Sequence, residues 1–266
     1  MSRKPIIAIP LGDAAGIGPE IVVKSFVNPK LRDSRLLVIG DRKTVENAVR
    51  ICGLNLGVRC VEGVGDACFE AGTLNLIDLN NIDMDSFCFG KISAMCGQAA
   101  YEYIEKSIQL AMARHVDAVA TPPINKESFA LAGIPYIGHT EVFESLTGSE
   151  DPLTMFEVGG LRVFFLTRHV SVRQACDLVT ESRIVDYVPR CVQALRRIGV
   201  ADGQLAIAGL NPHCGEHGLF GDEELTEIGP AVMRLRDMGY DVVGPIGADS
   251  VFHQTWEKRC RVVVRP

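Results

Sequence analysis

The sequence has little that would mark a secreted, membrane-bound or nucleic-acid-binding protein. Its N-terminal stretch MSRKPIIAIPLGD holds an apolar run that is too short for a secretion signal or a membrane span. Basic charge is not in excess, since 27 Lys and Arg face 33 Asp and Glu, which gives a formal net charge of −6. A basic stripe with interleaved aromatic residues is also missing. We therefore expect a cytoplasmic protein that binds neither membranes nor nucleic acids.

Disulfides and structural zinc sites are not expected either. The nine cysteines form no C-x-x-C pair, their number is odd, and no Cys/His spacing matches a structural zinc site. A chain of 266 residues buries enough surface to fold without disulfides. We expect mostly buried thiols in a reducing compartment.

Two familiar catalytic motifs are absent from the sequence. It has no G-x-S-x-G elbow, so a metal-independent hydrolase lacks support. The stretch GDAAGIGPE, residues 12–20, does not match the dinucleotide-binding pattern G-x-G-x-x-G, because its glycines fall at 12, 16 and 18. Its amides could cradle an anion at the start of a helix, or the stretch could be a tight structural turn.

Strand-like apolar runs alternate with amphipathic helical stretches along the chain. The apolar runs are residues 6–12, 36–41, 117–124, 161–167 and 204–210. A clear helix is predicted over residues 98–114. This alternation predicts an α/β fold with a mostly parallel sheet and helices on its faces. We place the boundary between two lobes in the region 122–140, which gives lobes of residues 1–130 and 131–266.

Several histidines lie in loops at the predicted carboxyl ends of strands, where open α/β sheets bind ligands. One of these segments, residues 121–141, has little helical period and many breakers, and it is interpreted as a loop. It carries Lys126, His139 and Thr140. Lys126 and His139 could bind a carboxylate or a phosphate, because each supplies charged or polar donors. A solvated surface loop is the alternative.

His169 and His213 each follow a predicted strand, and they could bind one metal ion together. Imidazole ligands suit zinc, nickel, copper or cobalt better than calcium or magnesium. A catalytic zinc usually has three protein ligands, and two histidines leave such a site short. His217 and Cys214 are further candidates, but their Gly- and Pro-rich loop does not enforce a common direction with His213. Hydrogen-bonded structural histidines are the alternative.

The motifs GDAAGIGPE, TPPINKE, GHTE, LTRH and GLNPHCGE, in this order, resemble the 4-hydroxythreonine-4-phosphate dehydrogenase (PdxA) family of pyridoxine biosynthesis. The resemblance runs from about residue 5 to about residue 255. The variants at residues 125–127 and 215–224 resemble the branch that acts on D-threonate or D-erythronate 4-phosphate. The resemblance implies a two-lobed fold like that of isocitrate and isopropylmalate dehydrogenases. It also implies a homodimer with the site at the interface.

The resemblance further implies an oxidation that uses NAD and a divalent metal. The metal is expected to be zinc, with magnesium or cobalt as alternatives. The substrate is expected to be a small 4-phosphorylated 3-hydroxy acid: 4-phospho-D-threonate, 4-phospho-D-erythronate or 4-phosphohydroxy-L-threonine. Its oxidation gives a 3-oxo acid that loses carbon dioxide. The family motifs match His139 and Thr140 as substrate-binding residues, with Lys126 as a further candidate, and His169 and His213 as metal ligands.

The family pattern continues beyond the end of this sequence with a YHDQG-like motif, whose histidine is the third metal ligand. His253 lies too early in the chain to take that place. The resemblance therefore implies a C-terminally truncated fold whose first lobe would normally be completed by a C-terminal segment. The alternative to an active dehydrogenase is a catalytically impaired relative that only binds ligand or an intact partner subunit.

Overall fold

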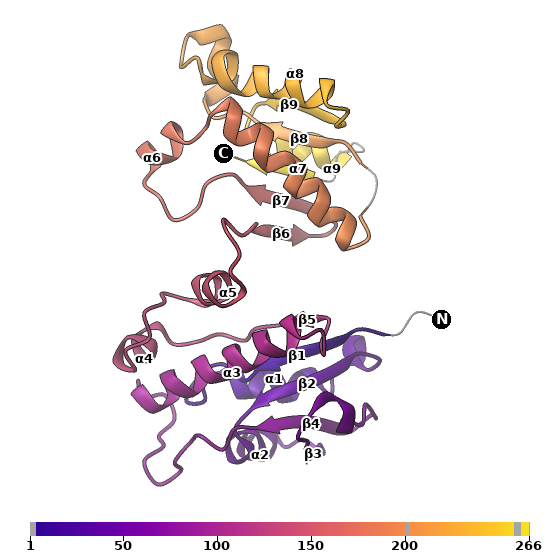
Figure 1. Cartoon of the computed structure of the whole chain (residues 1–266), viewed down its shortest axis with the longest axis vertical. Helices are drawn as coiled ribbons and strands as arrows, with labels where there is room; N and C mark the ends of the chain where they lie inside the picture. Colours follow the sequence, from indigo (N-terminus) through magenta and orange to yellow (C-terminus); the bar gives the residue numbers. More distant parts are fainter. Residues whose placement is uncertain (1–3, 201–202, 258–261, 266) are drawn as a thin grey trace. The chain divides into compact units, whose positions relative to one another are not determined.

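The computed structural model describes residues 4–200, 203–257 and 262–265, and it divides the chain into two compact units (Figure 1). Unit 1 is Met1–Pro152 and unit 2 is Leu153–Pro266. Each unit is built on a five-stranded sheet with helices packed against it, as the alternation in the sequence predicts. None of the helices in the described ranges has the length and apolar character that crossing a membrane requires.

Unit 1 contains a fully parallel sheet with the strand order β3-β4-β2-β1-β5. Its strands are β1 (Ile6–Pro10), β2 (Arg35–Gly40), β3 (Gly57–Cys60), β4 (Thr73–Asp78) and β5 (Ala118–Val119). Its helices are α1 (Gly18–Ser25), α2 (Arg42–Ile51), α3 (Ala94–Met112), α4 (Lys126–Leu131) and α5 (His139–Thr147), with short 3-10 turns η1 (Pro29–Leu31) and η2 (Val64–Asp66).

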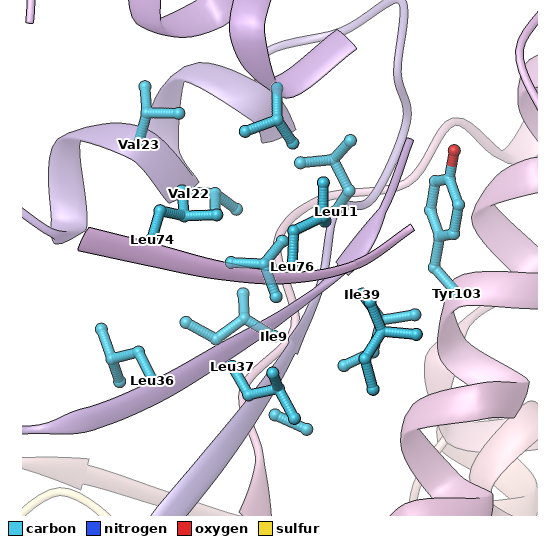
Figure 2. Close-up of a cluster of buried hydrophobic side chains, with 14 of the residues drawn as sticks. Ile9, Leu11, Val22, Val23, Leu36, Leu37, Ile39, Leu74, Leu76 and Tyr103 are labelled. Atoms are coloured by element: carbon cyan, nitrogen blue, oxygen red, sulfur yellow. The ribbon is translucent and has the colours of Figure 1, made fainter. Parts of the chain in front are cut away.

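The core of unit 1 lies on both faces of this sheet. Five consecutive residues of β2, from Leu36 to Gly40, are buried, which is typical of a central parallel strand covered on both sides. Figure 2 shows side chains of β1, β2 and β4 between Val22 and Val23 of α1 and Tyr103 of α3. The apolar runs predicted as strands at 6–12 and 36–41 are therefore confirmed.

Residues 121–141 are more regular than the sequence indicates. The predicted loop contains the short helix α4 and the start of α5. Asn125 caps α4, because its side-chain oxygen accepts a hydrogen bond from the Ser128 amide at 2.9 Å. Both helices pack on α3 in one buried cluster that includes Ile104, Phe129 and Val142. This packing joins the helices to unit 1, which ends at Pro152 rather than at the predicted boundary after residue 130.

Unit 2 has the strand order β6-β7-β10-β8-β9, in which only β6 runs antiparallel. Its strands are β6 (Met155–Val158), β7 (Leu161–Phe165), β8 (Leu205–Ala208), β9 (Val242–Ile246) and β10 (Val262–Arg265). Its helical segments are α6 (Val172–Asp177), α7 (Glu181–Arg197), η3 (Pro212–Gly218), η4 (Glu224–Ile228), α8 (Gly229–Asp237) and α9 (Val251–Glu257). The buried side chains of Val262, Val263 and Val264 place β10 at the centre of this sheet.

The cysteines of the described residues are all free thiols, and only Cys96 and Cys191 are fully buried. Cys60 and Cys88 are exposed, and the other described cysteines lie in between. The expectation of mostly buried thiols is therefore wrong. The described cysteines form no disulfide with one another, and Cys260 lies outside the described residues.

Candidate functional site

The loops that carry His169 and His213 leave the same edge of the sheet in unit 2. His169 follows β7 and His213 follows β8, and both strands pair in parallel with β10. The carboxyl ends of parallel strands lie at one edge, so β7 and β8 end about two strand spacings apart there, roughly 10 Å. This edge is where open α/β sheets bind ligands.

The turn η3 that carries His213 has an unusual backbone. His213, Cys214, Gly215, Glu216 and His217 all have positive φ angles, between 46° and 75°. Non-glycine residues lose about 1–2 kcal/mol each in this left-handed conformation, so a run of them persists only where other contacts hold it. His169 shares the feature with a φ of 53°. Sequence patterns do not indicate such strain.

His213 has a carboxylate partner that the sequence analysis missed. Its Nδ1 lies 3.3 Å from Oδ2 of Asp249, in the loop after β9. A carboxylate at Nδ1 favours the tautomer that is protonated there and leaves the lone pair on Nε2 for a ligand. Histidines that bind metals typically have such a partner. The two side chains are 63% and 59% exposed, so this ion pair itself contributes little to stability.

The donors at this edge do not by themselves complete a metal centre. Among the described residues, no group of three His, Cys, Asp or Glu side chains is arranged to hold a metal ion. Cys214 lies in the same turn, but burial, with Glu224 and Asp249 nearby, raises the pKa of its thiol and disfavours the thiolate that metals require. Among the described residues, the loops at this edge carry the imidazoles of His169, His213 and His217 as nitrogen donors.

The candidate substrate-binding residues lie in unit 1, at the N-termini of two helices. His139 and Thr140 are the first two residues of α5, after the N-cap Gly138, and Lys126 is the first residue of α4. Lys126 and Thr140 are exposed, whereas His139 is half-buried. Nε2 of His139 is buried and has no hydrogen-bond partner in the part of the chain that the structure describes. An unsatisfied buried nitrogen costs about 1–3 kcal/mol, which a polar ligand would recover.

His139 is expected to make stability depend on pH. Burial lowers the pKa of its imidazole below the ordinary value of 6.5, so the folded chain binds fewer protons than the unfolded chain below that value. The stability that the folded chain gains from a neutral His139 is therefore fully present above pH 6.5. It is lost as the pH falls from 6.5 through the lower pKa that His139 has in the folded chain. Urea titrations at two pH values, one on each side of 6.5, should show a smaller change in the free energy of unfolding for His139→Gln than for the unchanged chain.

The control for this measurement is His115→Gln, which removes an exposed histidine of the same unit. It should keep the pH dependence of the unchanged chain. An identical pH dependence in His139→Gln and the unchanged chain would show that the imidazole of His139 stays accessible to protons.

The glycine-rich stretch after β1 forms a tight turn against the loop that precedes α4. Gly12 has a φ of 74°, and a Cβ at this position would lie 2.6 Å from the backbone oxygen of Pro123. The amide of Asp13 donates to that same oxygen at 3.1 Å, and the Asp13 carboxylate accepts from the Ala15 amide at 3.1 Å. These contacts explain the glycine through close packing, which is the structural alternative for this motif.

Comparisons with known proteins place these features in context. Residues 32–265 match a family model described as "Pyridoxal phosphate biosynthetic protein PdxA". A Clostridium botulinum protein and a Fusobacterium nucleatum protein, both named "Putative D-threonate 4-phosphate dehydrogenase", are 53% and 54% identical to the chain over 265 and 254 residues. These alignments cover 99% and 95% of this chain, and 79% and 76% of the two relatives.

Solved structures agree in fold. A 4-hydroxythreonine-4-phosphate dehydrogenase from Klebsiella pneumoniae superposes with a TM-score of 0.91 at 36% identity, over 99% of this chain and 80% of that one. The corresponding enzyme from Burkholderia phymatum gives a TM-score of 0.88 at 38% identity, over 99% and 80% of the two chains. The predicted α/β fold with mostly parallel sheets is therefore confirmed.

Proposed function

Because this chain belongs to the PdxA family and is a dehydrogenase of that family, we propose that it oxidises D-threonate 4-phosphate with NAD as the hydride acceptor. The observation that carries the choice of substrate is the 53% identity, over 99% of the chain, to a relative named for that substrate. 4-Phospho-D-erythronate and 4-phosphohydroxy-L-threonine share the phosphate, the carboxylate and the 3-hydroxyl group, and they are the alternative substrates.

In this proposal, the N-terminal residues of helices α4 and α5 in unit 1 bind the substrate. Nε2 of His139 is a buried nitrogen without a partner in the described residues, and it would hydrogen-bond the substrate. Its lowered pKa keeps the imidazole neutral, so it can act either as donor or as acceptor. Thr140 supplies an exposed hydroxyl beside it, and Lys126 supplies an exposed ammonium group suited to the phosphate or the carboxylate.

His169 and His213 are the proposed metal ligands. Their imidazoles fit zinc or cobalt better than magnesium, which prefers oxygen ligands. The contact of His213 with Asp249 fits the carboxylate that typically orients a metal-bound histidine. A bound divalent metal would supply Lewis-acid chemistry, which lowers the pKa of the substrate hydroxyl.

The reaction then balances without a further co-reactant. The hydroxyl group at carbon 3 loses its proton, and the hydrogen on that carbon leaves as hydride to the nicotinamide ring. The resulting 3-oxo acid loses its carboxylate as carbon dioxide, and carbon 2 takes up one proton in its place, which offsets the proton released from the hydroxyl group. His139 and Thr140 contribute by holding the substrate in one orientation, since fixed geometry accounts for much of the barrier reduction in such reactions.

A homodimer is part of the proposal. The antiparallel edge strand β6 exposes Phe156 and Val158 at 61% and 70%, and exposed apolar edge strands favour association with another chain. Phe156 also packs edge-on against the ring of Phe165, at 4.8 Å between centroids, which fixes its orientation. Analytical ultracentrifugation of the purified chain would contradict this part if it found only monomers.

The substrate is tested by measuring NADH formation with the three candidate substrates, NAD and zinc. We expect turnover with D-threonate 4-phosphate, and a lower kcat/KM with 4-phospho-D-erythronate and with 4-phosphohydroxy-L-threonine. A higher kcat/KM with either of these would reassign the substrate. Thermal stabilisation by D-threonate 4-phosphate without any NADH would instead favour a relative that binds ligand but does not turn it over.

A further inference from the structure

A buried glutamate beneath the His213 turn has no role in the function described so far. Glu224 begins η4, a π-type turn that leads into α8, and the residue is only 3% exposed. Charged residues are almost never buried to this degree unless they are paired, because removing a charge from water is costly. No ion pair of Glu224 is found among the described residues. Its carboxylate is compensated by hydrogen bonds instead.

Among the described residues, the partners of the Glu224 carboxylate on other residues all belong to the segment between β8 and His213. Oε1 accepts from the amides of Leu210 and Asn211, each at 2.7 Å, and Oε2 accepts from Nδ2 of Asn211 at 2.9 Å. Hydrogen bonds to an ionised acceptor are about twice as strong as neutral ones. Burial alone would raise the pKa of Glu224, but these hydrogen bonds lower it overall and favour the charged form.

The glycines around the turn leave room for this carboxylate. A Cβ on Gly209 would lie 3.0 Å from Oε1 of Glu224, and a Cβ on Gly215 would lie 3.1 Å from Oε2. The Glu224 side chain thus touches the turn on both sides of His213. The left-handed run of residues 213–217 is costly in itself, and these contacts supply part of the compensation.

We propose that Glu224 is a positioning residue, whose buried carboxylate holds the left-handed turn in the one conformation that directs His213 to the metal. This inference rests on the proposed function, because it assumes that His213 is a metal ligand. The hydrogen bonds of the carboxylate go to residues 210 and 211, so its proposed effect on the metal is indirect. It acts through the backbone of residues 210 and 211. These residues precede the turn, so their conformation determines the position of the His213 backbone and the direction of its side chain.

The test is the affinity of the purified chain for Zn²⁺, measured by competition with a chromophoric chelator. Glu224→Gln keeps the size of the side chain but removes its charge and one acceptor. We expect zinc affinity to fall by about 10- to 100-fold, as for the loss of other partners that orient metal ligands. The visible spectrum of the Co²⁺-loaded chain should change as well, since it reports ligand geometry. Hydrogen exchange of the peptide that spans residues 209–218 should become faster.

The matched control is Glu227→Gln, which makes the same change in the same turn. Glu227 accepts a hydrogen bond from the amide of Glu181 at 2.6 Å, on α7 rather than on the His213 turn. Zinc affinity and the Co²⁺ spectrum should be unchanged in this variant. Asn211→Ala removes the side-chain donor to Glu224, together with its contact to Glu223, but keeps the two backbone donors to Glu224. Its zinc affinity should lie between those of the unchanged chain and Glu224→Gln.

Three results would overturn the role of Glu224, and they can be told apart. If the Glu224→Gln chain folds and its zinc affinity stays within about twofold of that of the unchanged chain, the carboxylate has only a structural role. An equal loss of affinity in Glu227→Gln would show a general effect of charge or stability. An unchanged chain that binds no zinc would contradict the metal ligands under the proposed function, and with them the role of Glu224. Should Glu224→Gln fail to fold, Asn211→Ala decides the question by the same measurements.

Discussion

Replacing His213 by asparagine is expected to lower the kcat/KM for NAD reduction by at least about 100-fold, since even the loss of an outer partner of a metal ligand costs about 10- to 100-fold. The reason is that His213 is one of two proposed nitrogen ligands at its sheet edge. Zinc affinity should fall in parallel. His169→Asn should have an effect of similar size. Initial rates of NADH formation and zinc titrations measure both changes.

Asparagine is the appropriate replacement because of the backbone. His169, His213 and His217 have φ angles of 53°, 50° and 58°, a region that asparagine tolerates better than alanine. His217→Asn is therefore a matched control within the same turn. His217 is exposed and is not a proposed ligand, so its kcat/KM and zinc affinity should stay within about twofold. Equal losses in His213→Asn and His217→Asn would contradict the assignment of His213.

Gly97→Ala is expected to destabilise unit 1 by about 1–3 kcal/mol or more, which is the usual cost of overpacking. A Cβ on Gly97 in α3 would lie 2.0 Å from the backbone oxygen of Ser128 and 2.9 Å from the backbone nitrogen of Phe129. No side-chain rotation relieves a clash with backbone atoms, so α4 must move. The gain in helix propensity from Gly to Ala, about 1 kcal/mol, does not offset this. Urea denaturation measures the change in free energy of unfolding.

Gly97→Ala should weaken the binding of substrate but not the binding of metal. α4 begins with Lys126, so its displacement should raise the KM for the phosphorylated substrate. The zinc affinity should not change, because His169 and His213 belong to unit 2. Gly65→Ala is the control, since a Cβ there would meet nothing within 4 Å. A Gly97→Ala chain as stable as the Gly65→Ala control would show that α3 and α4 separate easily.

The elements that could be predicted from the sequence are those whose pattern is local. The run at 161–167 contains β7, and the run at 204–210 contains β8, because every residue of β8 is buried and apolar. The helix predicted over 98–114 begins earlier, at Ala94, because the Ser93 side chain accepts a hydrogen bond from the Cys96 amide. Residues 117–124 are predicted as a strand that leads into a loop, and two of them, Ala118 and Val119, pair in the sheet as β5. The rest of that run leads into α4.

The parts of the site that the sequence did not reveal depend on contacts between distant segments. Asp249 meets His213 because β9 lies beside β8, an order that no local pattern encodes. Glu224 meets Leu210 and Asn211 because residues 212–218 fold into a left-handed turn. The histidines themselves were predicted because each follows an apolar strand. Asp249 and Glu224 were missed because glutamates and aspartates are common in surface loops.

The most direct test of the account is the rate of NADH formation from NAD and D-threonate 4-phosphate by the purified chain, before chelation, after chelation, and after Zn²⁺ is added back. The account predicts formation that disappears on chelation and returns with Zn²⁺, and that stays absent with Zn²⁺ in His213→Asn. A rate that chelation leaves unchanged, or a chain that forms no NADH even with Zn²⁺ present, would contradict it.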